Sequence, residues 1–301
     1  MTDMAAPAAD HDLAKQFADQ GFLVCEHLLG PEEIDELKAD LVRLARGEYP
    51  CGSLAPLPAD IPDDEAMNRI LCIHMPHFVS PLVRRYTTHP RIAEILGRVV
   101  GAHLKEGHWD GGVKCMQSMF FAKPPGKPGQ AWHQDEVYIP TRDRSLCGAW
   151  IAIDDANVDN GCLWVLPGSH KAGVLFPQKD HGRPDEFDVS PESYGFDDSA
   201  ELPVEVPAGS VVFFNGYLLH RSKKNVSGGY RRALVNHYMS TQSFLPWFVE
   251  DAENVGIARA DHRAVHVVTG KDPYKESGYV VPEDAVWLRQ YQEQPVTQQQ
   301  D

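Results

Sequence analysis

The sequence lacks the marks of an exported, membrane-spanning or disulfide-bonded protein. Its six cysteines are scattered along the chain, and no Cys-x-x-Cys pair occurs among them. No apolar run approaches the roughly 18 residues that a membrane-spanning helix needs, and no apolar N-terminal segment resembles an export signal. These absences predict a soluble, cytoplasmic protein with free thiols and no membrane partner.

Basic residues are also scarce. The chain has 28 Lys and Arg against 43 Asp and Glu, which gives a formal net charge of -15 at pH 7. Nucleic acids and acidic surfaces are normally bound by clustered Lys and Arg, so we do not expect a nucleic acid as a partner. Internal repeats are absent as well, and nothing in the composition indicates an oligomeric state.

The sequence shows two kinds of pattern, helical patterns before residue 112 and short β-rich runs after it. In "PEEIDELKADLVRLARG", Pro31 suits a first helical turn and apolar residues recur at helical spacing. Later runs such as "CGAWIAIDD", "CLWVLPGSH" and "VPAGSVVFFNGYLLH" are separated by turn residues, which favours a sandwich or barrel over alternating βαβ units. We therefore predict a mainly β fold with flanking helices (α+β).

The same patterns predict the organisation of the chain. Residues 171–209 form a long acidic connection without a clear period, and such loops in compact domains are usually lids or disordered segments. The expected segments are a disordered leader (1–12), one domain (13–290) and a polar tail (291–301). Within that domain we expect a helical part (13–111), a β core (112–245) that contains a lid insertion (171–209), and a C-terminal extension (246–290).

The stretch "QAWHQDEVYIP" raises the question of a metal site. Side chains two positions apart on a strand point to the same face, so His133 and Asp135 can bind one ion together. His220, on a later β-rich run, supplies a third ligand. Two imidazoles and one carboxylate are typical of non-haem Fe(II) oxygenases, in which open coordination sites remain for substrate, co-substrate and O₂.

A His-x-Asp triplet alone is weak evidence, because the chain has 14 His and many Asp. A second triplet, "HWD" at 108–110, lies among glycines that indicate a loop, so we interpret His108 and Asp110 as incidental. The alternative interpretation of the first triplet is that His133 and Asp135 are a surface or turn pair that binds no metal. His220 and a following arginine, Arg231, argue against it.

Arg231 follows the turn-rich "SKKNVSGG", and a hairpin through that turn returns it alongside His220. Its guanidinium could bind a carboxylate by two parallel hydrogen bonds. A 2-oxo acid could thus be held at its far end while its keto acid end chelates the metal. If this strand is extended, the adjacent Arg232 faces away.

These residues and their surroundings resemble the phytanoyl-CoA dioxygenase family of Fe(II)- and 2-oxoglutarate-dependent oxygenases across roughly 15–245. The similar segments are "CMQSMFFAKPPG", "HQD", "GAWIAIDDANVDNGCLWVLPGSH" and "PAGSVVFFNGYLLHRS", with "YRRALVNHYM" after it. The resemblance implies a double-stranded β-helix, the cupin-like jelly roll, with Fe(II) at one mouth and 2-oxoglutarate and O₂ as co-substrates. One departure, "AGS" at 208–210 where Gly-Asp is common, is at a turn outside the chemistry.

The resemblance also implies roles for particular residues. His133, Asp135 and His220 correspond to the iron ligands and Arg231 to the anchor of the distal carboxylate. Further candidate contacts to 2-oxoglutarate are Met119, Trp150, Gln134, Ser222 and Arg69, the last because relatives often carry Asn-Lys where this chain has "NR". For the substrate we select Tyr138, near the ligand strand, and His74.

Three functions compete at this point. An oxygenase would hydroxylate or otherwise oxidise a small organic molecule, and the retained carboxylate of Asp135 argues against halogenation. A catalytically inactive cupin-like binding protein would not need to keep the ligands and Arg231. A metal-dependent hydrolase or isomerase on the same scaffold would need no 2-oxo acid anchor. The net charge favours a small neutral, zwitterionic or cationic substrate over a coenzyme A ester.

Overall fold

The computed structural model describes residues 10–52, 54–105, 107–245, 265–274 and 285–291. The helices are α1 (Asp10–Gln20), α2 (Pro31–Ala45), α3 (Asp63–Asn68), α4 (Pro81–Thr87), α5 (Pro90–Val99) and the short 3-10 turns η1 (Pro76–Phe78), η2 (Asp135–Val137) and η3 (Ser169–Ala172). The strands of the larger sheet are β1 (Phe22–Cys25), β2 (Ile70–His74), β3 (Val113–Lys123), β5 (Cys147–Ala152), β10 (Val211–Asn215), β12 (Arg231–Ser240), β13 (His266–Thr269) and β14 (Trp287–Gln290). The remaining strands are β4 (Gln130–His133), β6 (Leu163–Val165), β7 (Gln178–Lys179), β8 (Glu192–Ser193), β9 (Leu202–Val204) and β11 (His220–Ser222).

Two antiparallel sheets form the core. The larger one has the order β1-β10-β5-β12-β3-β2-β14, with β13 paired to β3, and the smaller one has the order β4-β11-β6-β9. Strands distant in the sequence are therefore neighbours: β12 pairs with β3 over its whole length and with β5 from Ala233 to Tyr238. This arrangement confirms the predicted mainly β, jelly-roll fold, in which the sheets face each other and are not closed into a barrel.

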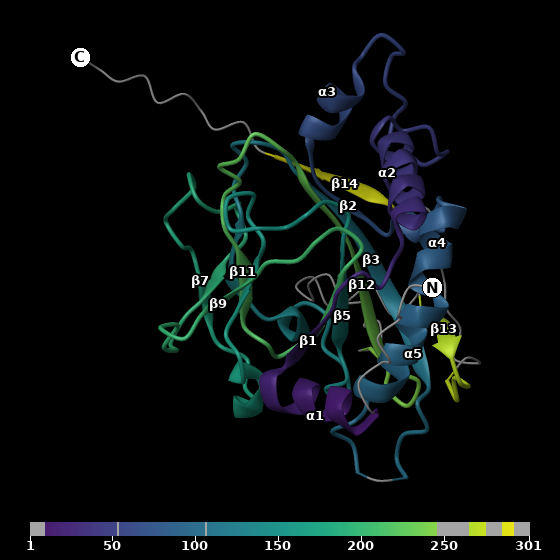
Figure 1. Ribbon diagram of the computed structural model, residues 1–301, viewed down its shortest axis with the longest axis vertical. Helices are drawn as coiled ribbons and strands as arrows, with labels where there is room; N and C mark the ends of the chain where they lie inside the picture. Colours follow the sequence, from purple (N-terminus) through teal and green to yellow (C-terminus); the bar gives the residue numbers. More distant parts are fainter. Residues whose placement is uncertain (1–9, 53, 106, 246–264, 275–284, 292–301) are drawn as a thin grey trace, which may run out of the picture.

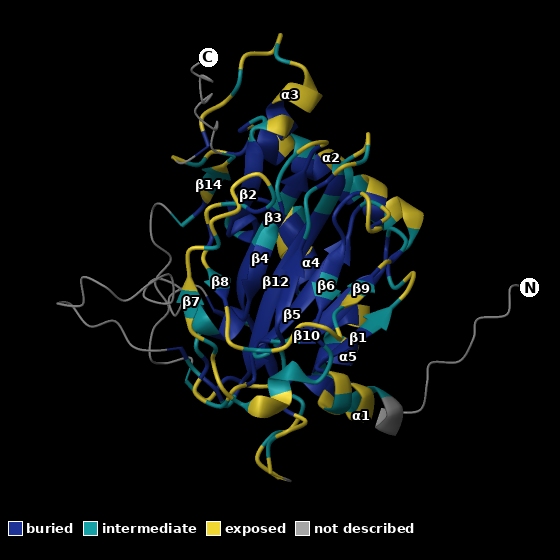
Figure 2. Cartoon of the chain, turned by 90° about the vertical axis from the view of Figure 1, so that its left-hand side faces the viewer, coloured by how far each residue is buried: buried dark blue, intermediate teal, exposed yellow. Residues whose placement is uncertain are grey.

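Three helices cover the outer face of the larger sheet. In Figure 1, α2, α4 and α5 lie on one side of β3 and β12, while β9 and β11 lie on the other. The strands alternate accordingly: Ala149 and Ile151 of β5 join the core beneath the helices, whereas Trp150 and Ala152 join the core between the sheets. Figure 2 shows the central strands buried and much of α1 and α3 exposed.

Several sequence predictions of local structure are confirmed. The expected helix at Pro31 is α2, and the β-rich runs "CGAWIAIDD", "CLWVLPGSH" and "VPAGSVVFFNGYLLH" contain β5, β6 and β10. The predicted leader 1–12 was too long, because α1 begins at Asp10; residues 1–9 and the tail beyond 291 lie outside the described residues. The predicted helical part missed β2, whose five buried residues have no period-two pattern to reveal a strand.

The predicted lid insertion 171–209 has its own short hairpin, β7–β8, and it ends in β9 at the edge of the smaller sheet. Backbone hydrogen bonds join it to the start of β4: Gly129 N donates to Glu186 O, and Asp188 N donates to Gly129 O. Gly129 is needed there, because a Cβ would lie 1.8 Å from the Ser222 carbonyl oxygen. The insertion therefore docks onto the core beside the predicted metal strand.

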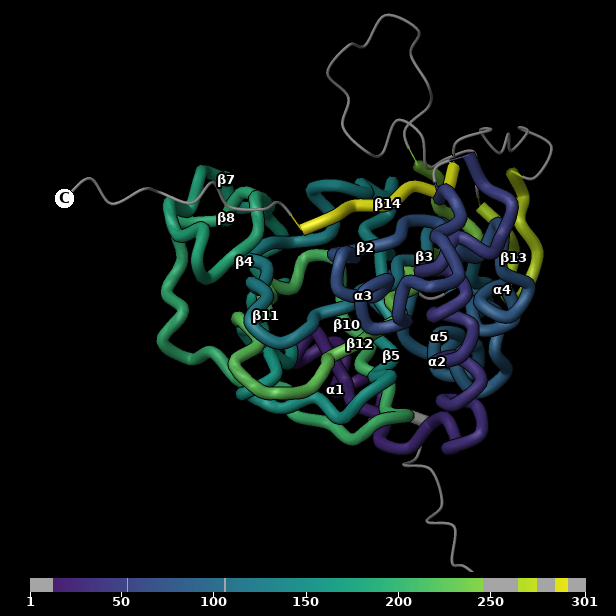
Figure 3. The backbone as a smooth tube through the Cα atoms, turned by 90° about the horizontal axis from the view of Figure 1, so that it is seen from above, coloured from purple at the N-terminus to yellow at the C-terminus, as the bar shows by residue number. Residues whose placement is uncertain are grey.

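The predicted C-terminal extension contributes β13 and β14 to the larger sheet; residues 246–264 and 275–284 of it lie outside the described residues. Strand β14 pairs with β2, so that Trp287 lies opposite His74, and the two strands run side by side in Figure 3. No helix in the described ranges is long and apolar enough to cross a membrane.

Candidate active site

A cavity of about 300 Å³ lies between the two sheets. Its walls come from β3, β5 and β12 of the larger sheet, from β4 and β11 of the smaller one, and from the insertion and β14 at its edge. His133, Asp135, His220 and Arg231 all line it. The fold thus brings together four residues that are dispersed in the sequence.

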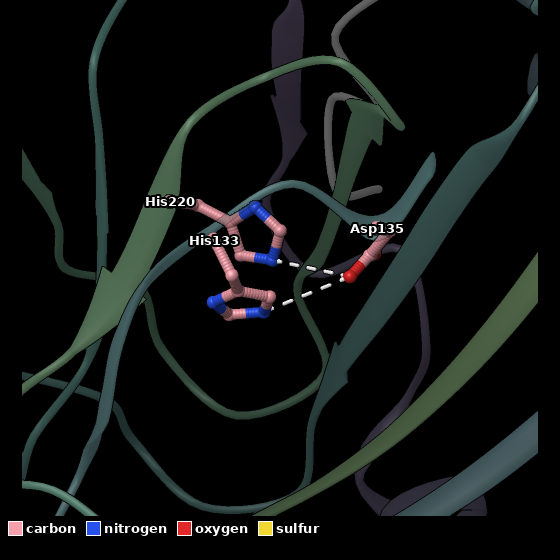
Figure 4. A group of neighbouring side chains, drawn as sticks. All are labelled: His133, Asp135 and His220. Carbon is pink, nitrogen blue, oxygen red and sulfur yellow. Dashed lines mark ion pairs between the residues drawn. The ribbon is translucent and has the colours of Figure 1, made fainter. Parts of the chain in front are cut away.

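His133, Asp135 and His220 meet at one point (Figure 4). Their ligand atoms all lie within 4.8 Å of one another, and among the described residues this is the one cluster of His, Cys, Asp and Glu that could hold a metal ion. Asp135 Oδ1 lies 3.6 Å from His133 Nε2 and 3.7 Å from His220 Nε2. His133 and His220 are register partners on β4 and β11, so strand pairing sets their separation.

Of the pair His133 and Asp135, only His133 lies on a strand. Strand β4 ends at His133, and Asp135 begins the turn η2. Gln134 between them keeps an extended backbone (φ -127°, ψ 128°), so the two ligand side chains still point to the same side.

Backbone carbonyls orient both imidazoles. His133 Nδ1 lies 2.8 Å from Ala131 O, and His220 Nδ1 lies 3.0 Å from Leu218 O. A carbonyl only accepts, so each Nδ1 carries the proton and each Nε2 presents a lone pair toward Asp135. Burial lowers the pKa of His133 to about 3, so this imidazole is neutral, as a metal ligand must be.

Asp135 is held from behind by His237 of β12. His237 Nε2 donates to Asp135 Oδ2 at 3.0 Å, which leaves Oδ1 as the oxygen that faces the two imidazoles. Burial alone would raise the pKa of Asp135, but His220, His237 and His133 together lower it. The donor set is therefore two imidazole nitrogens and one carboxylate oxygen, which fits a divalent transition metal such as Fe(II).

Sequence reasoning missed His237, although a signal was available. His237 stands six positions after Arg231, and an even spacing on a strand places both on one face. Both line the cavity.

Arg231 is buried, with 5% of its surface exposed. Its Nε donates to Gly161 O at 3.2 Å, and its guanidinium lies 5.7 Å from the centre of the Trp150 ring. Within the described part of the chain no carboxylate lies within ion-pair distance of it, and burial lowers its pKa. A buried cation without a counterion is costly, so the site calls for an anion beside Arg231.

A second buried cation, Lys123, lies opposite Arg231 in the β3–β12 register and was also missed. Its Nζ donates to Ser222 Oγ (2.8 Å), Lys223 O (2.7 Å) and Gly161 O (3.2 Å). Burial lowers its pKa well below the usual value. Gly161, in a positive-φ turn (φ 79°), thus offers one carbonyl to both cations. The available signal was a Lys directly after the apolar run 119–122 at the end of the strand.

The structure places most of the other predicted contacts at the cavity. Met119, Trp150, Ser222, Tyr138 and His74 all line it. The Ser222 hydroxyl is already engaged, because it accepts hydrogen bonds from Lys123 and from Gln130 N. Tyr138 accepts a hydrogen bond from Gln178 of the insertion at 2.8 Å.

Two of the predicted co-substrate contacts do not line the cavity. Gln134 is fully buried on the opposite side of the ligand strand, where its amide donates to Val174 O and Tyr217 O and accepts from Phe176 N. It fastens the start of the insertion instead.

Arg69 follows α3 and donates to Ala45 O at the end of α2 (2.7 Å). The last carbonyl groups of α2 have no partner within the helix, and the Arg69 guanidinium binds one of them. Arg69 therefore does not line the cavity.

Two further interpretations are consistent with the geometry. The carboxylate of Asp110 accepts from Gly112 N within its own loop, and neither His108 nor Asp110 lines the cavity. Arg232 forms two hydrogen bonds to Asp154, at 2.8 and 2.7 Å, on the face of β12 away from the cavity.

Known structures share this fold. The apo form of the non-haem monooxygenase ThoJ superposes with a TM-score of 0.63 at 19% identity, covering 94% of this chain and 89% of that one. The epimerase SnoN, in complex with Fe³⁺, α-ketoglutarate and nogalamycin RO, superposes with a TM-score of 0.58 at 21% identity, covering 79% and 86%. At such identities the likeness shows the fold alone.

Sequence comparison reaches further. The chain is 26% identical over 276 residues to phytanoyl-CoA dioxygenase domain-containing protein 1 of Danio rerio, covering 78% of this chain and 91% of the relative. It is 27% identical over 280 residues to the peroxisomal phytanoyl-CoA dioxygenase of Bos taurus, covering 87% and 77%. A sequence profile of the family, described as phytanoyl-CoA dioxygenase, matches residues 17–233. Because that match spans most of the chain, the protein belongs to the phytanoyl-CoA dioxygenase family of iron- and 2-oxoglutarate-dependent oxygenases.

Proposed function

We propose that this protein uses Fe(II), 2-oxoglutarate and O₂ to hydroxylate or otherwise oxidise a small organic metabolite, with release of succinate and CO₂. One observation carries the proposal: a two-histidine, one-carboxylate cluster and an unpaired buried arginine line the same cavity. A metal site alone would suit a hydrolase or isomerase. The arginine supplies what those enzymes do not need, a receptor for a dicarboxylic co-substrate.

Each residue has a distinct task in this proposal. His133, His220 and Asp135 Oδ1 hold Fe(II), and His237 keeps Oδ2 of Asp135 turned away. When bound, iron supplies the activation of O₂ and the chelation of the keto acid end of 2-oxoglutarate. Arg231 binds the distal carboxylate, and Lys123, its register partner on β3, shares the Gly161 carbonyl with it. Trp150 and Met119 line the cavity and exclude water from the co-substrate.

The retained carboxylate of Asp135 bears on the outcome. A halogenating enzyme would need room for chloride among the metal ligands, and here that position is filled by an ionised side chain held by His237. Oxidation of a C–H bond then consumes one O₂ and one 2-oxoglutarate, and one oxygen atom goes to succinate and the other to the hydroxylated product. Chlorinated product in chloride buffer would contradict this assignment.

We also propose a small substrate over a coenzyme A ester. The phosphates of coenzyme A call for free basic residues at the mouth. Arg142 and Arg144 instead stack on Phe244 and Tyr217, Lys223 pairs with Glu201, and none of these three basic residues lines the cavity. A preference for acyl-coenzyme A esters that weakens steeply with salt would overturn this choice.

The deciding experiment measures O₂ consumption and succinate formation by the purified protein with Fe(II) and 2-oxoglutarate. We expect slow turnover without a prime substrate, dependent on both additions. Asp135→Ala serves as the matched control, since it removes one ligand from the same fold. Absence of succinate from protein that has bound Fe(II) and 2-oxoglutarate would favour an inactive binding protein. Metal-dependent conversion that needs no O₂ would favour a hydrolase or isomerase.

A further inference from the structure

Two segments that are remote in sequence from the metal strands line the cavity near the exposed Val189, and we call this part of the cavity its mouth. The insertion contributes Asp188, Val189 and Ser190, and the C-terminal strand β14 contributes Arg289. Backbone hydrogen bonding of Asp188 to Gly129 fixes the insertion beside β4, and pairing of β14 with β2 fixes the strand. Figure 3 shows β14 beside β2 on the side of the molecule that carries β4 and β8.

An ion pair joins the two segments at this point. Arg289 Nη2 lies 3.4 Å from Asp188 Oδ2 and donates to Ser190 Oγ at 2.9 Å. Asp188 Oδ1 in turn accepts from Ser190 N at 2.8 Å. The Asp188 side chain is 9% exposed and that of Arg289 is 27% exposed, so the pair is largely shielded from solvent. Its single long contact leaves hydrogen-bonding capacity on both partners.

The other charged residues that line the cavity already have tasks or partners. Lys123 donates to three protein acceptors, and Arg221 pairs with Glu201. Asp135 and Arg231 belong to the metal and co-substrate sites proposed above. The charged groups left for the prime substrate are therefore Asp188 and Arg289.

A neighbouring buried histidine also points to a polar ligand. His74 is 3% exposed and lines the cavity, and its Nε2 has no hydrogen-bond partner among the described residues. Its ring stacks on Trp287 with centroids 3.6 Å apart. Trp287 and Arg289 stand two apart on β14, so they share a face of that strand. An unpaired ring nitrogen thus lies on the same side of the sheet as the ion pair.

We propose that Asp188, Arg289 and His74 form the recognition site for the prime substrate, and that this substrate is a small α-amino acid. Arg289 receives its carboxylate, Asp188 receives its ammonium group, and His74 Nε2 makes a polar contact to its side chain. The inference rests on the proposed function, because it names the substrate class of that same site.

The geometry favours a zwitterion for two reasons. The ion pair puts one cation and one anion 3.4 Å apart, and an α-amino acid carries its ammonium and carboxylate groups on one carbon atom. Binding then replaces one ion pair by two, so no charge is left buried without a partner. A substrate with only a carboxylate would displace Asp188 from its cation, and one with only an ammonium group would displace Arg289.

The first test uses three pools of probes: the free protein amino acids, their α-carboxamides and their N-acetyl derivatives. Stimulated succinate formation and calorimetric binding are measured with Fe(II) and 2-oxoglutarate present. We expect the free amino acid pool alone to bind and to stimulate turnover. No response to that pool, with unstimulated turnover intact, overturns the inference and leaves the proposed function standing. Loss of unstimulated turnover itself would instead be a failure of the proposed function.

The second test uses variants of the pair. Arg289→Gln and Asp188→Asn should each raise the amino acid concentration for half-maximal stimulation by about 30-fold or more relative to the wild type. Arg183→Gln is the matched control, because Arg183 pairs with Glu192 in the same insertion and does not line the cavity.

The double variant Asp188→Arg with Arg289→Asp separates recognition from a mere latch between the two segments. If the pair only fastens the insertion, exchanging its charges should restore stimulation to the wild-type level, and that result would overturn the inference. If the pair binds the substrate, the exchange reverses the orientation of the amino acid relative to the metal. The amino acid should then stimulate succinate formation without a matching amount of oxidised amino acid.

Discussion

The inner end of the cavity and its mouth are built in different ways. The inner end lies on paired strands, where register fixes His133 opposite His220 and Arg231 opposite Lys123. The mouth depends on an insertion and a short C-terminal strand, held by a few long-range contacts. Reaction chemistry needs ligand atoms placed within tenths of an ångström, which strand pairing provides, whereas loops can change without disturbing it. The inner end is therefore suited to hold the reacting groups, and the mouth is suited to select the substrate.

The largest effect should come from removing a ligand at the inner end. His133→Ala, Asp135→Ala and His220→Ala are each expected to abolish turnover with the fold intact, because two remaining ligands hold Fe(II) poorly in an open site. Metal content and succinate formation measure the loss. His108→Ala, in the other His-x-Asp triplet, should behave like the wild type. Full activity in any ligand variant at ordinary iron concentration would refute the cluster.

A smaller effect is expected one step behind the metal, at His237. His237→Gln removes the ring that holds Asp135 Oδ2 and should weaken metal binding by about 10- to 100-fold, as for other residues that orient a ligand. Titration of the metal-free protein with Fe(II) under anaerobic conditions measures this. Unchanged affinity, with unchanged 2-oxoglutarate binding, would show that strand geometry alone orients the carboxylate.

The smallest effect concerns stability and compares buried imidazoles inside and outside the site. Burial lowers the pKa of His74 and His133 to about 3 and that of His77 well below its usual value. In the unfolded chain these imidazoles bind protons near pH 6.5, whereas in the folded protein they stay neutral until the pH is much lower. The unfolding free energy of the metal-free protein should thus decrease as the pH is lowered from 6.5. Each group contributes up to about 1.4 kcal/mol of this decrease per pH unit.

His77→Phe isolates one of these groups, because His77 binds Ser118 and does not line the cavity. Denaturant unfolding between pH 5 and pH 7 should show a shallower loss of stability than in the wild type, while metal affinity stays the same. An identical pH slope would mean that His77 is protonated in the folded protein.

The sequence alone predicts the inner end of the cavity better than its mouth. A later β-rich run and the turn after it led to His220 and Arg231. Two-residue spacing correctly placed the side chains of His133 and Asp135 together, because Gln134 keeps an extended backbone although β4 ends at His133. The same rule could have found His237. Arg69 was misplaced because it follows a short helix after an irregular loop, where no period fixes the direction of a side chain.

The mouth was beyond such reasoning. Asp188 and Arg289 meet only because the insertion docks on Gly129 and β14 pairs with β2, and both contacts join residues far apart in the chain. Local patterns carry no information on such pairings. The acidic composition of the insertion suggested a lid, yet Gln134, expected to contact the co-substrate, is one of the residues that fastens it.

The most direct test of the account is the affinity of the metal-loaded, oxygen-free protein for 2-oxoglutarate, measured by calorimetry on the wild type and Arg231 variants. Arg231→Ala should weaken binding by about 30-fold or more, since losing a buried charged partner costs about 2 to 5 kcal/mol. Arg231→Lys should recover part of it, and Arg232→Gln, whose parent residue pairs with Asp154, should bind like the wild type. Unchanged 2-oxoglutarate affinity in Arg231→Ala would contradict the assignment of the inner end as the co-substrate site.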